Sequence, residues 1–230
     1  MEMVIPLSEV FLAAAIHASL QLQLGGLLLL YHASLGKHVR TKTKYLVDSY
    51  ISGIGMLVFL SLAATCFILS CYFDGMLYTE EILIIAGLLI AMALIVWMFY
   101  YRRGRSTELW LPRTVAKYID ERAKNTNSNT EAFSLGVLTS LAEMPFTIVL
   151  YLVAANSIMA LEPLAQLLAV AGYTLITILP PIILRLAVRR GQTIVEIQRW
   201  RVKHKNFFRI LAGIGFLTLG LFILAFEVLA

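Results

Sequence analysis

The sequence predicts an all-α polytopic membrane protein with six transmembrane helices, arranged as two inverted three-helix repeats. Composition is the first observation, because 60% of the 230 residues are hydrophobic and only 14% are charged, against about 25% charged in soluble domains. The mean hydropathy of +0.81 agrees with this. The second observation is a set of six long apolar segments, and the third is the confinement of all basic residues to the stretches between alternate segments.

The six apolar segments cover residues 9–32, 46–70, 82–101, 132–155, 164–187 and 207–229. About 20 apolar residues, rising ~1.5 Å each in a helix, cross the hydrocarbon of a bilayer. The first segment follows MEMVIPLSE, which contains acids but no Lys or Arg. Because a signal peptide has a basic start, we predict a retained transmembrane helix here instead.

The charges predict the orientation. All 19 Lys and Arg residues fall on one side of the predicted membrane: Lys37, Arg40, Lys42, Lys44, Arg102, Arg103, Arg105, Arg113, Lys117, Arg122, Lys124, Arg185, Arg189, Arg190, Arg199, Arg201, Lys203, Lys205 and Arg209. The other side carries only acids: Glu2, Glu9, Asp74, Glu80, Glu81, Glu162 and Glu227. The positive-inside rule therefore predicts a multi-pass protein of the plasma (inner) membrane with both termini outside the cytoplasm. A solvated basic rim against anionic headgroups accounts for the net charge of +5, so no nucleic-acid partner is expected.

The long basic stretch in the middle divides the chain. We predict a first three-helix repeat at 1–101, a cytoplasmic basic linker at 102–131 and a second three-helix repeat at 132–230. The run NTNSNT at 125–130 is typical of a flexible linker. Before it, LWLPRTVAKYIDERAK is either a short interfacial helix behind Pro112 or a solvated connector.

Three helices, a linker and three more helices imply that the second half crosses the membrane in the opposite direction. In such inverted repeats the binding site lies near the bilayer midplane, at the repeat interface. Phe11–Ser34 and Phe133–Asn156 resemble each other in length and in having polar residues halfway along. Gln21 and Glu143 accordingly occupy comparable depths in their helices.

Glu143 is the leading candidate for a functional residue. It lies in the middle of the fourth apolar segment, two residues before Pro145, and a carboxylate at that depth costs about 3 kcal/mol or more. Thr139 and Thr147 are four residues to either side and share its helical face. The alternative is a protonated structural carboxyl group that hydrogen-bonds a neighbouring helix.

Two other helices contribute polar groups at a similar depth. In the first, His17 and Gln21 share a face. In the fifth, Pro180 and Pro181 remove two backbone donors and free the carbonyls of residues 176 and 177. Broken backbone is tolerated in a membrane where it is buried in protein or lines a water-filled cavity. We therefore predict one midplane substrate or ion site from Glu143, Thr139, Thr147, Gln21, His17, Pro180 and Pro181.

Other chemistries find little support in the sequence. Cys66 and Cys71 form neither a CxxC motif nor a zinc pattern. No GxSxG, HExxH or nucleotide-binding motif is present. We expect no enzymatic activity and no cofactor, and we assign no metal ligand.

Three features resemble one family of transporters. They are the layout of three helices and three helices, the segment FSLGVLTSLAEMP from Phe133 to Pro145, and the glycines Gly213, Gly215 and Gly220 of the last segment. By these features the chain is similar to the lysine-exporter (LysE-type) superfamily, which includes amino-acid exporters, small metal-ion exporters, the sulfolipid-addressing-protein-like family and the membrane part of thiol–disulfide carriers. The first helix lacks the Pro-Gly-Pro-like element of many members. Neither cysteine lies in the first helix of a half, which argues against electron transfer.

The resemblance implies that Glu143 and Pro145 are cavity residues. Together with the residues above, it predicts a secondary transporter that exports a small polar solute or cation, driven by an ion gradient or a partner protein. The alternative is a non-transporting membrane scaffold or an assembly factor of an envelope complex. The lipid bilayer is an expected partner in either case, and a homo-oligomer stays open.

Overall fold

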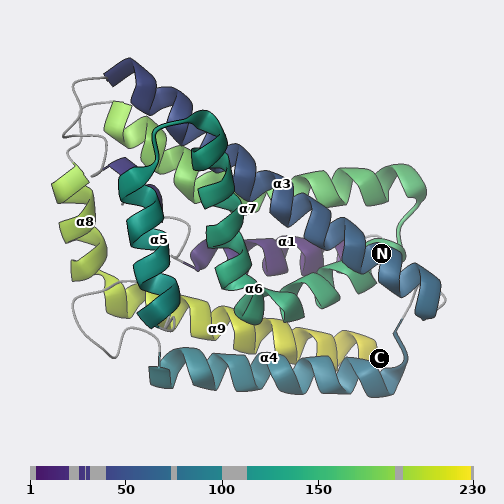
Figure 1. Cartoon of the computed structure of the whole chain (residues 1–230). Coiled ribbons are helices and arrows are strands. Elements are labelled where there is room, and N and C mark those ends of the chain that lie inside the picture. The colour runs from purple at the N-terminus through teal and green to yellow at the C-terminus, as the bar shows by residue number, and fades with distance from the viewer. Residues whose placement is uncertain are drawn as a thin grey trace.

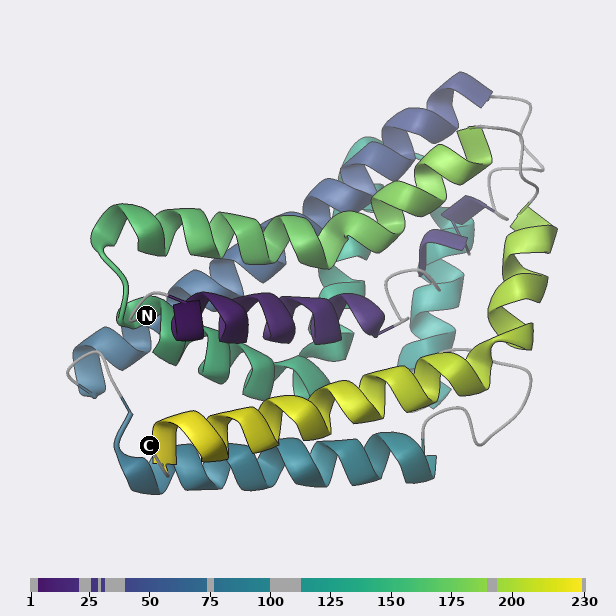
Figure 2. The same ribbon diagram turned by 180° about the vertical axis from the view of Figure 1, so that it is seen from behind.

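The computed structural model describes residues 4–20, 26–28, 30–31, 40–73, 77–99, 113–189 and 194–228. Within these ranges the protein is all-helical and contains no strand (Figures 1 and 2). The elements are α1 Val4–Ser19, α3 Arg40–Tyr72, α4 Thr79–Phe99, α5 Arg113–Asn125, α6 Asn129–Met159, α7 Pro163–Arg189, α8 Ile194–Lys203, α9 Lys205–Ile223 and a π-helical turn η1 Leu224–Val228. The predicted all-α class is confirmed.

Five helices are long and apolar enough to cross a membrane: Lys44–Tyr72, Thr79–Met98, Asn129–Met159, Pro163–Val188 and Lys205–Val228. The first predicted segment, 9–32, is described only in part: α1 has 16 residues, and residues 26–28 and 30–31 are also helical. The described residues therefore provide five spans, and the sixth is not confirmed. Several apolar helices of this length are compatible with a membrane protein.

The stretch before the NTNSNT run forms a helix, α5. It buries Ile119 and Ala123, while Lys117, Glu121 and Lys124 are exposed and form the i,i+4 pairs Lys117–Glu121 and Lys124–Asp120. Both views show α5 and α8 running crosswise to α4 and α9 at one end of the molecule. The prediction of a short helix here is thus confirmed, in preference to a connector without structure.

The NTNSNT run itself joins two helices and belongs mostly to their ends. Asn125 ends α5 and Asn129 begins α6. Ser128 caps α6, because its side chain accepts a hydrogen bond from the Glu131 N–H while the Glu131 carboxylate accepts one from the Ser128 N–H. This reciprocal arrangement is a capping box, and its S-x-x-E pattern stands in the sequence.

The helix α6 occupies the centre of the fold, packed against α3, α1 and α7, while α4 packs along α9. Glycines allow α3 and α6 to touch through their backbones. A Cβ added at Gly136 on α6 would collide with the Tyr50 carbonyl oxygen on α3, and one added at Gly53 would collide with the Phe133 carbonyl oxygen on α6. Small residues at crossings give helices this close approach.

The glycines of α9 contact two neighbouring helices. A Cβ at Gly213 would collide with the Trp97 side chain of α4, and one at Gly220 would lie 3.3 Å from the Ala86 carbonyl oxygen. A Cβ at Gly215 would lie 2.8 Å from Ile16 of α1. Packing is therefore a sufficient physical reason for these three glycines.

Contacts of α7 differ along its length. It remains helical through Pro180 and Pro181 but changes direction partway along, as Figure 2 shows. Past the prolines, the Arg185 guanidinium donates to the Asp48 carboxylate of α3 at 2.7 Å. Before them, α7 lies against α1.

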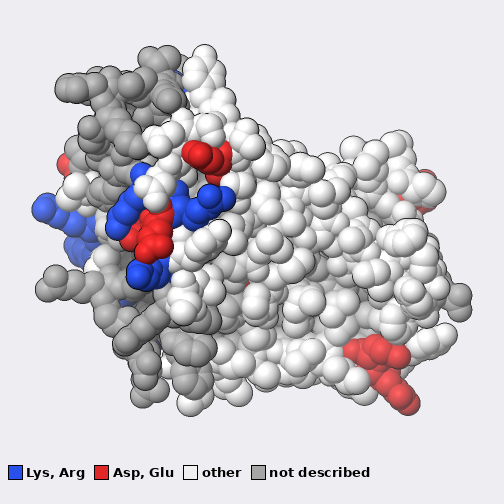
Figure 3. Space-filling view, viewed as in Figure 1, with Lys and Arg blue, Asp and Glu red and all other residues white. Residues whose placement is uncertain are grey.

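The two described ends of the chain lie at the same end of the molecule (Figures 1 and 2). On the face in Figure 3 the Lys and Arg side chains gather at the opposite end, whereas the end with the termini shows only acids. The helices α1 and α6, α3 and α7, and α4 and α9, which are counterparts in the two predicted halves, are in contact. The internal repeat and the division at 102–131 stay predictions.

Candidate functional site

The site is built on one buried stripe of α6. Thr139, Glu143, Thr147 and Tyr151 follow one another at intervals of four residues, which places them on one face of the helix. Their exposed fractions are 0%, 0%, 0% and 3%. Pro145 lies inside this helix, and α6 changes direction partway along (Figure 1). Proline removes one intrahelical hydrogen bond and is a common cause of such bends.

The helix α1 brings His17 against this stripe. His17 is 1% exposed, and its Nε2 lies 3.8 Å from Oε2 of Glu143. That separation is too long for a hydrogen bond, and Nε2 has no hydrogen-bond partner in the described structure. It is short enough for a strong electrostatic interaction whenever the imidazole is protonated.

The other imidazole nitrogen contacts α7. Nδ1 of His17 lies 3.1 Å from the Tyr173 hydroxyl, and the tautomer decides which of the two donates. The ring centroids of Tyr151 and Tyr173 lie 5.5 Å and 5.8 Å from that of His17, and 5.9 Å from each other. Two aromatic rings therefore hold the imidazole beside the Glu143 carboxyl group, and both of these ionisable groups are buried.

The threonines of the site satisfy their hydroxyl groups within their own helices. Thr139 donates to the Leu135 carbonyl at 2.8 Å, Thr147 to the Glu143 carbonyl at 3.4 Å and Thr177 to the Tyr173 carbonyl at 2.9 Å. Thr139 also lies beside Tyr50 of α3, because a Cβ added at Gly26 would meet both side chains. The groups with the greatest capacity to bind or release an ion are thus Glu143 and His17.

Two of the predicted site residues, the prolines of α7, lie apart from the Glu143–His17 pair. Pro181 is buried within α7, and Pro180 is half-buried. Pro180 lines a cavity of about 710 Å³. Gln21 lies outside the described residues.

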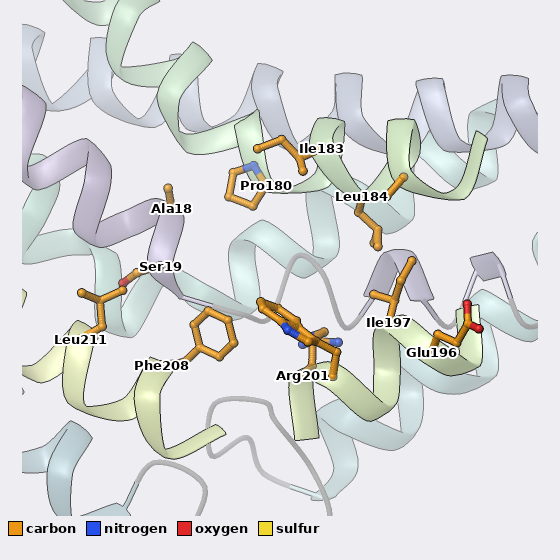
Figure 4. A pocket seen from close by; sticks show the side chains of 12 residues that line it. Ala18, Ser19, Pro180, Ile183, Leu184, Glu196, Ile197, Arg201, Phe208 and Leu211 are labelled. Atoms are coloured by element: carbon orange, nitrogen blue, oxygen red, sulfur yellow. The ribbon is translucent and has the colours of Figure 1, made fainter. Parts of the chain in front are cut away.

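The cavity lies next to the buried cluster and toward the basic end. Ala18 and Ser19, which directly follow His17, line it on one side, and residues from α7, α8 and α9 complete it (Figure 4). Figure 4 shows Pro180 and Ile183 across the cavity from Arg201 and Phe208. The lining is mainly apolar, and 710 Å³ falls within the usual range of ligand pockets.

Arg201 corrects the prediction of a fully solvated basic rim. This α8 side chain is 1% exposed and donates to the Gln198 side chain at 3.3 Å. Burial follows from the position of α8, which folds over the end of the cavity. The sequence contains no local signal that separates Arg201 from its exposed neighbours.

Tyr151 and Tyr173 are also site residues that the sequence did not single out. The interval of four residues from Thr147 to Tyr151, and from Tyr173 to Thr177, could have identified them. Within the described ranges, no three His, Cys, Asp or Glu side chains group to hold a metal ion.

No family model, curated protein or solved structure matches this chain. The likeness to the lysine-exporter superfamily therefore stays an expectation from the residues quoted for it. The geometry of the site has to support any functional conclusion by itself.

Proposed function

We propose that the chain is a secondary membrane transporter that moves a small polar solute or cation through the site formed by Glu143 and His17. One observation supports this most directly: a carboxyl group and an imidazole, 0% and 1% exposed, lie 3.8 Å apart among apolar helices. Ionisable groups inside a membrane are expensive and typically serve ion or substrate pathways.

The Glu143–His17 pair is suited to exchanging a proton for a cationic substrate. An ionised Glu143 needs a compensating positive charge, because a buried unpaired charge is strongly destabilising. Three states avoid such a charge: a protonated, neutral carboxyl group, a carboxylate beside a protonated His17, or a carboxylate beside a cationic substrate. Alternation between these states couples movement of the substrate to movement of a proton.

The cavity supplies the access route in this proposal. It begins at Ala18 and Ser19, beside His17, and extends past Pro180 toward Arg201. A solute that enters from the basic end would therefore reach the residues next to the buried pair. Release at the opposite end, which exports the solute from the cytoplasm, requires α1, α6 and α7 to separate there.

We further propose that the basic end faces the cytoplasm and that both termini lie outside, since cytoplasmic loops are enriched in Lys and Arg. Reporter fusions after Gly36, Asn127 and Gln192 should report the cytoplasm, and fusions after Asp74 and Glu162 the outside. A single fusion that reports the opposite side would contradict this topology.

The transport proposal is tested by flux in proteoliposomes that contain a pH-sensitive dye. Pulses of K⁺, Mn²⁺, lysine or arginine across the membrane should change the internal pH only where the purified protein is present. Vesicles without protein and vesicles with Glu121→Gln, an exposed carboxylate on α5, are the controls. Folded protein that produces no pH change or tracer uptake with any of these cations would contradict transport and favour the scaffold.

A further inference from the structure

A second buried carboxyl group lies at the end of the molecule that carries the termini. Glu9 of α1 is 1% exposed, and its Oε2 lies 2.5 Å from the Ser157 hydroxyl of α6. The same hydroxyl lies 3.0 Å from the Val153 carbonyl oxygen. Ser157 has one hydrogen to give, and a carbonyl can only accept. Ser157 therefore divides its one hydrogen between the Glu9 carboxyl oxygen and the Val153 carbonyl, so α6 gives Glu9 no more than a shared donor.

A second acid lies beside Glu9. The Glu227 carboxyl group of η1 lies close enough for the two acids to interact electrostatically. Oε1 of Glu9 receives no donor from the described residues. Two carboxylates in contact cannot both be ionised without strong repulsion. A proton on the pair removes this repulsion.

Among the residues that the structure describes, no positively charged side chain lies at this end of the molecule. Asn156 of α6 approaches both carboxylate oxygens of Glu227 at 3.4 Å through its neutral amide. The first turn of α4, packed against η1, contributes the further acids Glu80 and Glu81. The Lys and Arg side chains that the structure describes belong to the opposite end.

The helix α1 connects this pair with the Glu143–His17 site. Glu9, Ala13 and His17 are spaced by four residues on one face and are 1%, 0% and 1% exposed. Eight residues of helix separate Glu9 from His17 by about 12 Å. One buried face of α1 therefore carries an ionisable group at each of two depths.

We propose that Glu9 and Glu227 form a proton-binding site, distinct from Glu143 and His17, that holds one shared proton at the acid-bearing end of the protein. Ser157 and Asn156 position the two carboxyl groups. This site does not depend on whether the chain transports a solute. Its ligand is the proton, since the described residues gather no third carboxyl, imidazole or thiol group there that would hold a metal ion.

Infrared spectroscopy of the purified protein tests the proposal, because a protonated carboxyl group has a carbonyl band that an ionised one lacks. The difference spectra of wild type minus Glu9→Gln and wild type minus Glu227→Gln should both contain this band near neutral pH. In each variant the remaining carboxyl group accepts from the new amide and ionises. Glu80→Gln, an exposed acid at the same end, should leave the band in place.

A variant that retains both carboxyl groups controls for misfolding of the two glutamine variants. Ser157→Ala removes the hydrogen bond that Ser157 donates to Glu9, so the band should change frequency but persist. In addition, the Tm of the wild type should fall as pH rises past neutrality, because the folded state binds one proton more than the unfolded state. Absence of the band from both difference spectra would overturn the proposal, as would stabilisation by Na⁺ without the band.

Discussion

Replacement of Gly136 by leucine is expected to separate α6 from α3 and to leave little folded protein. A Cβ at this position would collide with the Tyr50 carbonyl oxygen and lie 3.2 Å from the Ile54 nitrogen. Both are backbone atoms, so no side chain can move aside. Overpacking typically costs about 1–3 kcal/mol, and a wedge between two backbones should reach the upper end of this range.

The measurement is thermal unfolding of the purified variant in detergent, together with the yield of monodisperse protein. The matched control is Gly87→Leu, since a Cβ at Gly87 has no neighbour within 4 Å. The control should unfold at nearly the wild-type temperature. Equal Tm values for the two variants would show that α3 and α6 do not cross through these glycines.

Replacement of Glu143 by glutamine is expected to abolish coupled transport while the fold persists. The amide has the shape of the carboxyl group and still hydrogen-bonds, so the free energy of unfolding should change by only about 1 kcal/mol. It can neither ionise nor bind a proton, so it can neither compensate a cation nor couple its movement to protons. Flux should fall to the level of vesicles without protein.

This second experiment separates two roles of Glu143. Flux and Tm are measured on the same preparation, with Glu121→Gln as the exposed control. A silent result in both measurements would mean that Glu143 serves only as a hydrogen-bonding group between helices. Full flux in Glu143→Gln would remove this carboxyl group from the mechanism even where the wild type transports.

The sequence was sufficient to predict the elements that depend on local composition. Long apolar runs predicted the five spans, and Pro112 with an amphipathic pattern predicted α5. The cost of a buried charge predicted that Glu143 faces the interior, where it is 0% exposed beside α1. The first predicted segment, 9–32, differs from the prediction, since α1 ends at Ser19. The composition of this segment alone would allow a longer helix.

What the sequence could not provide depends on contacts between distant segments. Tyr173 lies 156 residues from His17, and only the packing of α7 on α1 brings them together. Glu9 looked like one of several exposed acids, and Arg201 like one of several exposed bases. Their burial results from the positions of η1 and α8, which no local pattern encodes.

The two prolines of α7 divide this helix into two halves that bond to different helices. Pro180 and Pro181 lack the N–H groups that would bond the carbonyls of residues 176 and 177, so bending there breaks no such bond. The half before them is attached to α1 through Tyr173 and His17, and the half after them to α3 through Arg185 and Asp48. The prolines therefore mark the boundary between two differently anchored halves of α7, and the cavity wall formed by Ile183, Leu184 and Ala187 belongs to the half that is bonded to Asp48 rather than to the half that holds the imidazole beside Glu143.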